Sequence, residues 1–151
     1  MGDRHEQVVN ELNTMGGGTL GERMGIVFLE ASPERVVARM PVAGNTQPYG
    51  LLHGGASVVL AETLGSIAAV LHAGEGRIAV GVDINATHHR AVRQGFVTGV
   101  ATPLSLGNTL AAYEVVITDE DDNRVCPPRV PCPIPPKPPR SCPPPPHPWG
   151  P

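Results

Sequence analysis

One long apolar segment constrains the fold of this chain more than any other feature. Residues 56–71 are almost all apolar, and they directly follow Gly54 and Gly55. A helix that is apolar on nearly every side has to be buried, so this text predicts a central helix at about Gly55–His72. The run contains one carboxylate, Glu62. Burying a carboxylate is costly unless it is paired, so packing alone does not explain this residue.

The predicted helix places several chemically useful groups near one another. Glu62 follows the two glycines by about two turns, and Ser66 lies one turn further along the same face. The first N–H groups of a helix have no partner within it, so those of Gly54, Gly55 and Ala56 can stabilise a negative charge. Together these groups offer a base or nucleophile and an oxyanion site.

Two polar residues precede the helix, and each has a simple structural explanation when taken alone. His53 is placed to hydrogen-bond the turn at the helix start, and Gln47 is placed as a surface residue of a loop. A single Glu in a core helix is likewise most often one that reaches the rim of the core. It is the combination of Gln47, His53 and Glu62 that suggests a catalytic site.

Four blocks of sequence then carry a resemblance to a known family. The chain resembles hotdog-fold acyl-CoA thioesterases of the phenylacetate-pathway type, without an obvious gap from about Leu12 to Val125. It is most similar to the branches of that family that act in menaquinone and enterobactin synthesis. The blocks, which occur in the family's order and spacing, are Met15-Gly16, Gln47–Ser66, Val82–Arg90 and Pro103–Gly107.

The order of predicted elements agrees with that resemblance. One long helix followed by an antiparallel meander predicts an α+β fold, and the resemblance implies an antiparallel sheet wrapped around the central helix. A first helix is expected at His5–Met15. Strands are expected at Ile26–Glu30, Arg35–Met40, Ile78–His88, Gly95–Thr102 and Thr109–Thr118, with a last segment starting near Arg124.

The resemblance also implies a mechanism and an assembly. Glu62 would attack a thioester or activate a water molecule, and the residues leave these two routes open. The N–H of Gly54, with Gly55 beside it, would hold the oxyanion, while Gln47 and His53 would orient the reactants. In relatives the carboxylate of one subunit faces the helix start of another. A homodimer with shared active sites is therefore expected, and two such dimers are expected to form a homotetramer.

The expected ligand is an acyl-CoA, with coenzyme A as part of the substrate and no further cofactor. Arg90 is suited to pair with phosphate, whereas the loop around Ser105 carries less His and Arg than in relatives, which leaves its grip on phosphate open. Aromatic residues make up 3% of the chain, so an aliphatic acyl pocket is expected. The resemblance assigns to substrate and CoA binding Gly55, Ser66, Gly81, His88, His89, Arg90, Ala91, Ser105, Leu106, Gly107 and Asn108.

The acyl group itself is not determined by the sequence. An aryl- or hydroxyaryl-CoA thioester is expected, and 1,4-dihydroxy-2-naphthoyl-CoA of menaquinone synthesis is one candidate. The alternative is a hotdog module that binds acyl-CoA without hydrolysing it. An exposed Glu62 would favour that alternative.

Composition narrows the remaining classes. With 151 residues the chain is long enough for one domain with a real core, and no apolar run suggests a signal peptide or a membrane span. A cytoplasmic protein is expected. Residues 1–125 carry 8 basic and 14 acidic side chains, which argues against nucleic-acid binding. The spacing of the histidines and of the three cysteines fits no metal site.

The end of the chain is unusual because 14 of residues 126–151 are proline. The hotdog domain is expected to cover 1–125, with its last strand running to about 134 and an irregular tail at 135–151. Prolines at 127, 128, 131 and 133 would remove hydrogen-bond donors on both sides of that strand. Two interpretations are open. Either Thr, Ala or Ser codons have been misread as proline, or 135–151 is a polyproline II segment for a proline-binding partner.

Overall fold

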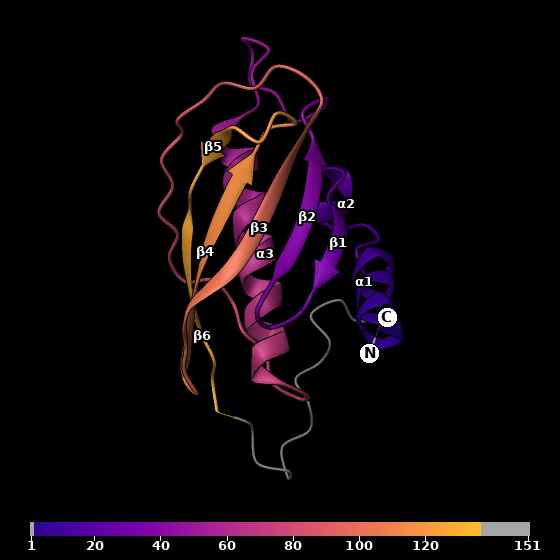
Figure 1. Ribbon diagram of the computed structural model, residues 1–151, viewed down its shortest axis with the longest axis vertical. Helices are drawn as coiled ribbons and strands as arrows, with labels where there is room; N and C mark the ends of the chain where they lie inside the picture. The colour runs from indigo at the N-terminus through magenta and orange to yellow at the C-terminus, as the bar shows by residue number, and fades with distance from the viewer. Residues whose placement is uncertain (1, 137–151) are drawn as a thin grey trace.

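A six-stranded antiparallel sheet curves around one long helix in the computed structural model of the chain, which describes residues 2–136 (Figure 1). The elements are α1 (Gly2–Met15), α2 (Leu20–Arg23), β1 (Val27–Ala31), β2 (Val36–Pro41), α3 (Gly54–Ala73), β3 (Phe96–Leu106), β4 (Leu110–Thr118), β5 (Arg124–Cys126) and β6 (Arg129–Pro133). The strand order is β1-β2-β3-β4-β5, and β6 pairs with β4 beyond β5. The predicted α+β hotdog architecture is confirmed.

Glycines on both partners allow α3 to lie close to the sheet. A Cβ added to Gly65 would come within 2.9 Å of Val130 Cβ, and one added to Gly99 would come within 2.5 Å of Leu64 Cδ1. Eight residues of α3 are buried on this side. By length and composition alone α3 would suit a membrane span, but its packing on β2, β3, β4 and β6 is that of a core helix.

The opposite side of α3 remains partly open. The sheet covers only one face of the helix, so the prediction that α3 is buried all round is wrong for a single chain. Glu62 is exposed there and the other side chains are half-buried. The residues of this open face are Val59, Glu62, Thr63, Ser66 and Val70.

The strand predicted at Ile78–His88 is absent, which corrects the sequence interpretation. This stretch runs along the outside of β6 and β5 as an extended segment (Figure 1), and it forms a single bridge, between Asn85 and Arg129. Arg129 N–H donates to Asn85 O at 2.9 Å, and Asn85 N–H donates to Arg129 O at 3.2 Å. Beyond that pair, Val82 N–H donates to the carbonyl of Pro131, but the nitrogen of Pro131 carries no hydrogen and cannot donate to residues 78–85.

The prolines of β6 occupy one side of the strand only. Successive residues of a strand direct their N–H groups to alternate neighbours. Because Arg129 donates toward the 78–85 segment, Pro131 and Pro133 face that segment as well. Val130 and Cys132 face β4, where they pair with Tyr113 and Ala111. For the two prolines within β6, the prediction that they interrupt both sides is therefore wrong, because the ladder to β4 is kept and only the ladder to residues 78–85 is interrupted. Pro127 and Pro128 lie between β5 and β6, and Pro128 faces β4, where its carbonyl accepts from Val115 N.

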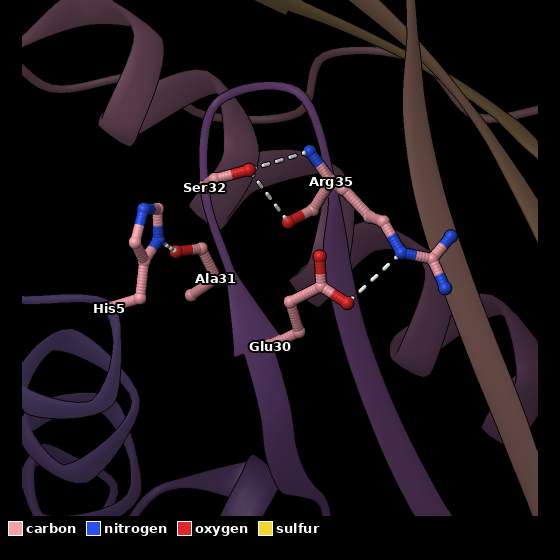
Figure 2. Close-up of polar contacts among 5 residues, drawn as sticks. All are labelled: His5, Glu30, Ala31, Ser32 and Arg35. Carbon is pink, nitrogen blue, oxygen red and sulfur yellow. Dashed lines mark hydrogen bonds and ion pairs between the residues drawn. The ribbon is translucent and has the colours of Figure 1, made fainter. Parts of the chain in front are cut away.

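Helix α1 covers the edge strand β1 through side-chain contacts. Asn13 imitates a neighbouring strand, donating from Nδ2 to Phe28 O at 3.0 Å and accepting from Phe28 N at 2.8 Å through Oδ1. His5 Nδ1 donates to Ala31 O at 3.3 Å (Figure 2). These contacts occupy backbone groups that an edge strand would otherwise leave unpaired. Of the predicted tail, only Pro135 and Pro136 fall within the described residues.

Candidate active site

The start of α3 offers one free backbone donor. His53 is the N-cap residue, and its Nδ1 accepts a hydrogen bond from the N–H of Gly55 at 2.8 Å. The N–H of Ala56 is donated to the carbonyl of His53. Gly54 N–H takes part in none of these cap and turn hydrogen bonds within the described residues. Gly54 is thus available as an oxyanion donor, while the N–H of Gly55, predicted to stand beside it, is already in use.

Gly54 is also required by close packing. A Cβ at this position would lie 2.7 Å from Nε2 of His88 and 3.1 Å from its Cε1, so the imidazole rests directly on the glycine. This contact brings the predicted segment His88–Ala91 to the start of the helix. A cavity of about 350 Å³ forms there, lined by Gln47, Leu51, Leu52, Gly54, Ser57, His88, His89, Arg90, Ala91 and Val125.

The loop before the helix orients the amide of Gln47. Its backbone N–H donates to Leu51 O at 2.8 Å, and its side-chain Oε1 accepts from Tyr49 N. With Oε1 engaged in the turn, Nε2 is the part of the amide left to donate into the cavity. The structure therefore brings Gln47, Gly54 and the His88–Ala91 segment together, as the resemblance implied they would be.

Glu62 lies in a different, smaller cavity. Its side chain is exposed, which contradicts the predicted burial, and its Oε1 would be 3.2 Å from a Cβ on Gly81. The absence of that Cβ leaves room for the carboxylate beside the 81–84 segment. The cavity has a volume of about 330 Å³ and is lined by Glu62, Gly81, Val82, Asp83 and Ile84.

The carboxylate and the free N–H cannot act on the same atom within one chain. Eight residues separate Gly54 from Glu62 along α3, which corresponds to about 12 Å at 1.5 Å per residue. A reacting carbonyl has to lie about 3 Å from both groups. A single chain therefore carries two halves of a site rather than a complete one.

Ser66 faces a buried thiol that the sequence analysis did not single out. The thiol is that of Cys132 on β6, whose Sγ donates to Val130 O at 3.9 Å. Burial raises the pKa of Cys132, the nearby Ser66 hydroxyl opposes this rise, and the negative charge of Glu62 adds to it. Cys132 therefore stays a neutral thiol beneath the carboxylate. Within residues 2–136 no three His, Cys, Asp or Glu side chains come close enough to hold a metal ion.

The predicted CoA-binding residues fall into two groups at opposite ends of α3. His88–Ala91 lies at the helix start, whereas Ser105–Asn108 lies at the helix end, where His72 Nε2 contacts Gly107 O at 2.9 Å. Gly54 and His72 are eighteen residues apart, or about 27 Å along the axis. The structure does not bring the two groups together in one chain. His72 was missed because its contact joins residues distant in sequence.

A larger apolar cavity of about 670 Å³ opens on the other flank of the open face. It is lined by α1, α2 and β1, and by Thr63 and Ile67 of α3. Phe28 is its aromatic side chain, and Glu22 is its one charged group. Because Thr63 follows Glu62 directly, the cavity begins next to the carboxylate-bearing turn of the helix.

Known proteins similar to this chain are thioesterases. A family model described as the thioesterase superfamily matches residues 49–126. The proofreading thioesterase EntH of Cronobacter sakazakii is 47% identical over 124 residues, covering 82% of this chain and 90% of that protein. A Haemophilus influenzae thioesterase structure gives a TM-score of 0.83 at 36% identity, covering 89% of this chain and 94% of that one. A mutant Pseudomonas aeruginosa thioesterase gives 0.80 at 38%, covering 83% and 92%.

Proposed function

Since this chain belongs to the thioesterase superfamily and is a thioester hydrolase of hotdog fold, we propose that it hydrolyses the CoA thioester of an aryl or hydroxyaryl acid. 1,4-Dihydroxy-2-naphthoyl-CoA is the specific candidate. The apolar cavity beside Thr63 supports this choice, because its volume of about 670 Å³ suits a bicyclic acyl group and Glu22 disfavours an anionic one. The proposed compartment is the cytoplasm, where acyl-CoA esters are made.

The proposed reaction uses the groups that the chain leaves free. The carbonyl oxygen of the thioester accepts a hydrogen bond from Gly54 N–H, which strengthens as negative charge develops on that oxygen. Gln47 Nε2 and His53 orient the thioester or the water. In one route Glu62 attacks the carbonyl, CoA leaves as a thiol after taking up a proton, and water hydrolyses the mixed anhydride. In the other, Glu62 removes a proton from the attacking water.

We propose that the site is completed by a second copy of the chain. The observation that carries this step is the separation of about 12 Å between Gly54 and Glu62 on one helix. A homodimer related by a twofold axis would place each Glu62 opposite the partner copy's helix start, giving two equal sites. The apolar side chains of Val80 and Val82 flank Gly81, which contacts Glu62; they are 57% and 63% exposed and would be covered there. A dimer of such dimers is the proposed tetramer.

The exposed Glu62 also fits a module that binds acyl-CoA without hydrolysing it. A substitution of Glu62 therefore tests hydrolysis against binding alone. Glu62→Gln keeps the shape of the side chain and removes its charge. We expect kcat to fall by on the order of 10³ with little change in KM or folding, because the interaction acts mainly in the transition state. Thiol release from aryl-, β-keto- and fatty acyl-CoAs measures both the activity and the preferred acyl group.

Glu75→Gln is the matched control, because Glu75 is exposed just beyond the end of α3. It removes the same charge and should leave kcat unchanged. If Glu62→Gln stays within about tenfold of the wild-type kcat, Glu62 takes no part in the reaction. Absence of thiol release from the whole substrate panel would instead favour the binding module.

A further inference from the structure

Asn45 ties the end of α2 to the end of β2. Its side-chain Nδ2 donates to Met24 O at 2.7 Å and to Pro41 O at 2.8 Å. Met24 caps the C-terminus of α2, and Pro41 is the last residue of β2. A side-chain amide nitrogen carries two hydrogens, so each carbonyl takes one of them. Both donors of Asn45 are therefore used within the fold, and none is left for a ligand.

Gly25 allows these two ends to approach each other. It has a φ of 73°, which favours glycine, and a Cβ added to it would lie 2.8 Å from Cγ of Pro41. The chain that leaves α2 therefore passes directly against the end of β2. This close approach brings the carbonyls of Met24 and Pro41 within reach of a single amide group.

The backbone of Asn45 is hydrogen-bonded as fully as its side chain. Its N–H donates to Val42 O at 2.9 Å, and Gly44 between them has a φ of 83°, as the third residue of a type II turn requires. The carbonyl of Asn45 accepts from the N–H of His53 at 2.8 Å. His53 is the N-cap residue of α3. Asn45 thus connects the body of the fold to the start of the central helix.

The hydrogen bond between Asn45 and His53 closes the loop between these residues at its base. Thr46 and Leu52 form a bridge just inside this pair. Leu52 N–H also donates to Val92 O at 2.7 Å, which anchors the loop to the chain that precedes β3. The loop is therefore anchored twice, by Asn45 at one end of its base and by Leu52 at the other.

Two groups of the proposed mechanism extend from this base. Gln47 lies two residues after Asn45, and Gly54 directly follows His53. Gln47 and Gly54 both line the cavity of about 350 Å³ at the start of α3, whereas Asn45 does not line it. The separation between Gln47 Nε2 and Gly54 N–H therefore depends on how Asn45 and His53 are held together.

We propose that Asn45 is a positioning residue for thioester hydrolysis. Its side-chain contacts hold the loop in the orientation in which Gln47 and Gly54 both reach one thioester group. This inference rests on the proposed function. A shift of about 1 Å in a group that contacts the substrate can cost on the order of 10² in rate, even when the altered residue is remote from the reaction. Asn45 therefore affects kcat without contacting the substrate.

Asn45→Ala removes both side-chain hydrogen bonds and keeps the backbone ones. We expect kcat to fall by on the order of 10², with KM for an acyl-CoA changed by no more than about twofold, because the lost contacts act on orientation rather than on binding. Asn45→Ser keeps a hydroxyl that can donate to one carbonyl, so its kcat should fall less. Thiol release from an acyl-CoA gives both constants.

Ser32→Ala is the matched control for the loss of two hydrogen bonds in a turn. Ser32 Oγ donates to Arg35 O at 3.2 Å and accepts from Arg35 N–H at 3.0 Å, in the turn between β1 and β2 (Figure 2). Both bonds join a side chain to the backbone, as those of Asn45 do. Ser32 does not line the cavity shared by Gln47 and Gly54. Ser32→Ala should therefore keep the wild-type kcat and KM.

Hydrogen exchange, followed by NMR on the full chain, separates a local role from a general loss of stability. In Asn45→Ala the N–H of His53 should exchange at least about tenfold faster, because its acceptor is no longer fixed. The N–H of Leu52, which donates to Val92 O, should keep its wild-type protection. A general loss of stability would instead speed up exchange at both positions alike.

Coupling to Gln47 tests whether the effect on kcat arises in the site. When Gln47 is already replaced by alanine, Asn45 has one group fewer to place. Asn45→Ala should then lower kcat by only about tenfold, rather than by about 10²-fold. A loss by the same factor in both backgrounds, or a wild-type kcat for folded Asn45→Ala, would overturn the proposal.

Failure of the proposed function would appear differently, as no thiol release by the wild-type chain from any CoA ester. Exchange at His53 would still report on the loop in that case, and unchanged exchange there in Asn45→Ala would show that the side chain of Asn45 does not hold it. If Asn45→Ala does not fold, Asn45→Ser is measured in both backgrounds and judged by the same criteria.

Discussion

At the scale of single residues, Gly54 serves two needs that no other amino acid meets together. Its N–H is free at the start of α3, and its missing side chain leaves room for the ring of His88. His53 contributes by taking up the neighbouring N–H of Gly55, so that one donor rather than two faces the cavity. The site therefore depends on the missing side chain of Gly54 as much as on its backbone N–H.

Gly54→Ala tests the close contact directly. We expect a loss of stability of roughly 1–3 kcal/mol, because the new Cβ would overlap His88 and force a local shift. His88→Ala removes the ring, so adding Gly54→Ala to that variant should cost little or be favourable in a helix. Urea denaturation of the four proteins gives the coupling between the two sites. An equal cost of Gly54→Ala in both backgrounds would contradict the contact.

The sequence named the candidate residues of this site but not their hydrogen bonds. Gly54, Gln47 and Glu62 stand in the motif that carries the resemblance, so they could be named in advance. The use of Gly55 N–H depends on the rotamer of His53, which no pattern encodes. Asn45 holds its loop through carbonyls at the ends of α2 and β2, and its neighbours in the sequence give no sign of this.

At the scale of elements, β6 explains why the segment after α3 is not a strand. Residues 78–84 carry a β-branched side chain at every second position, which favours a strand, and three of these side chains, Ile78, Val80 and Val82, are exposed. A strand also needs a partner that donates. Pro131 and Pro133 offer carbonyls without N–H groups on that side, so pairing stops at Asn85. The periodicity of this segment is that of a strand, but the strand does not form. Its failure depends on the prolines of β6, which are distant in sequence and do not affect the local pattern.

Replacing one proline should restore part of the missing ladder. Pro131→Val supplies an N–H that faces residues 82–85. One added hydrogen bond contributes about 0.5–1.5 kcal/mol. Removing proline gives back about 0.4–1 kcal/mol of unfolded-chain entropy, so overall stability should change little. The expected effect is local: hydrogen exchange at Val82 and Asn85 should slow by roughly two- to tenfold.

Pro128→Val is the control for this exchange experiment. Pro128 lies on the side of the chain that serves β4, where its carbonyl accepts from Val115 N at 2.8 Å. Its replacement should leave exchange at residues 82–85 unaltered. Faster or unchanged exchange in Pro131→Val would mean that something other than the missing donor keeps this segment out of the sheet.

At the scale of the whole molecule, one chain contains every group of the proposed mechanism but in the wrong arrangement. Gly54 and Gln47 line one cavity, Glu62 lines another, and α3 holds them about 12 Å apart. The open face of α3, which carries Glu62, and the side chain of Val82 are both accessible to solvent in a single chain. The architecture could be predicted from the order of elements. The incompleteness of the site could not, because it appears only when the distance between Gly54 and Glu62 is compared with the distance over which both must contact one carbonyl group.

Mixing two inactive variants tests whether the site is shared between copies. Glu62→Gln removes the carboxylate, and Gln47→Ala removes the donor that lines the same cavity as Gly54. In a mixed dimer with shared sites, one site carries both defects and the other carries neither. Random reassociation of equal amounts makes half of the dimers mixed, so activity should recover to about a quarter of wild type.

If each chain instead carried a complete site, every site in the mixture would keep one defect and no activity would return. The control replaces the second partner by the double variant Glu62→Gln with Gln47→Ala, which leaves no Glu62 in any dimer. Thiol release is measured after the chains have been co-refolded, and the control mixture should stay inactive. Recovery in the first mixture and not in the second would require that the carboxylate of one copy serves the helix start of the other, because no intact combination exists within either chain.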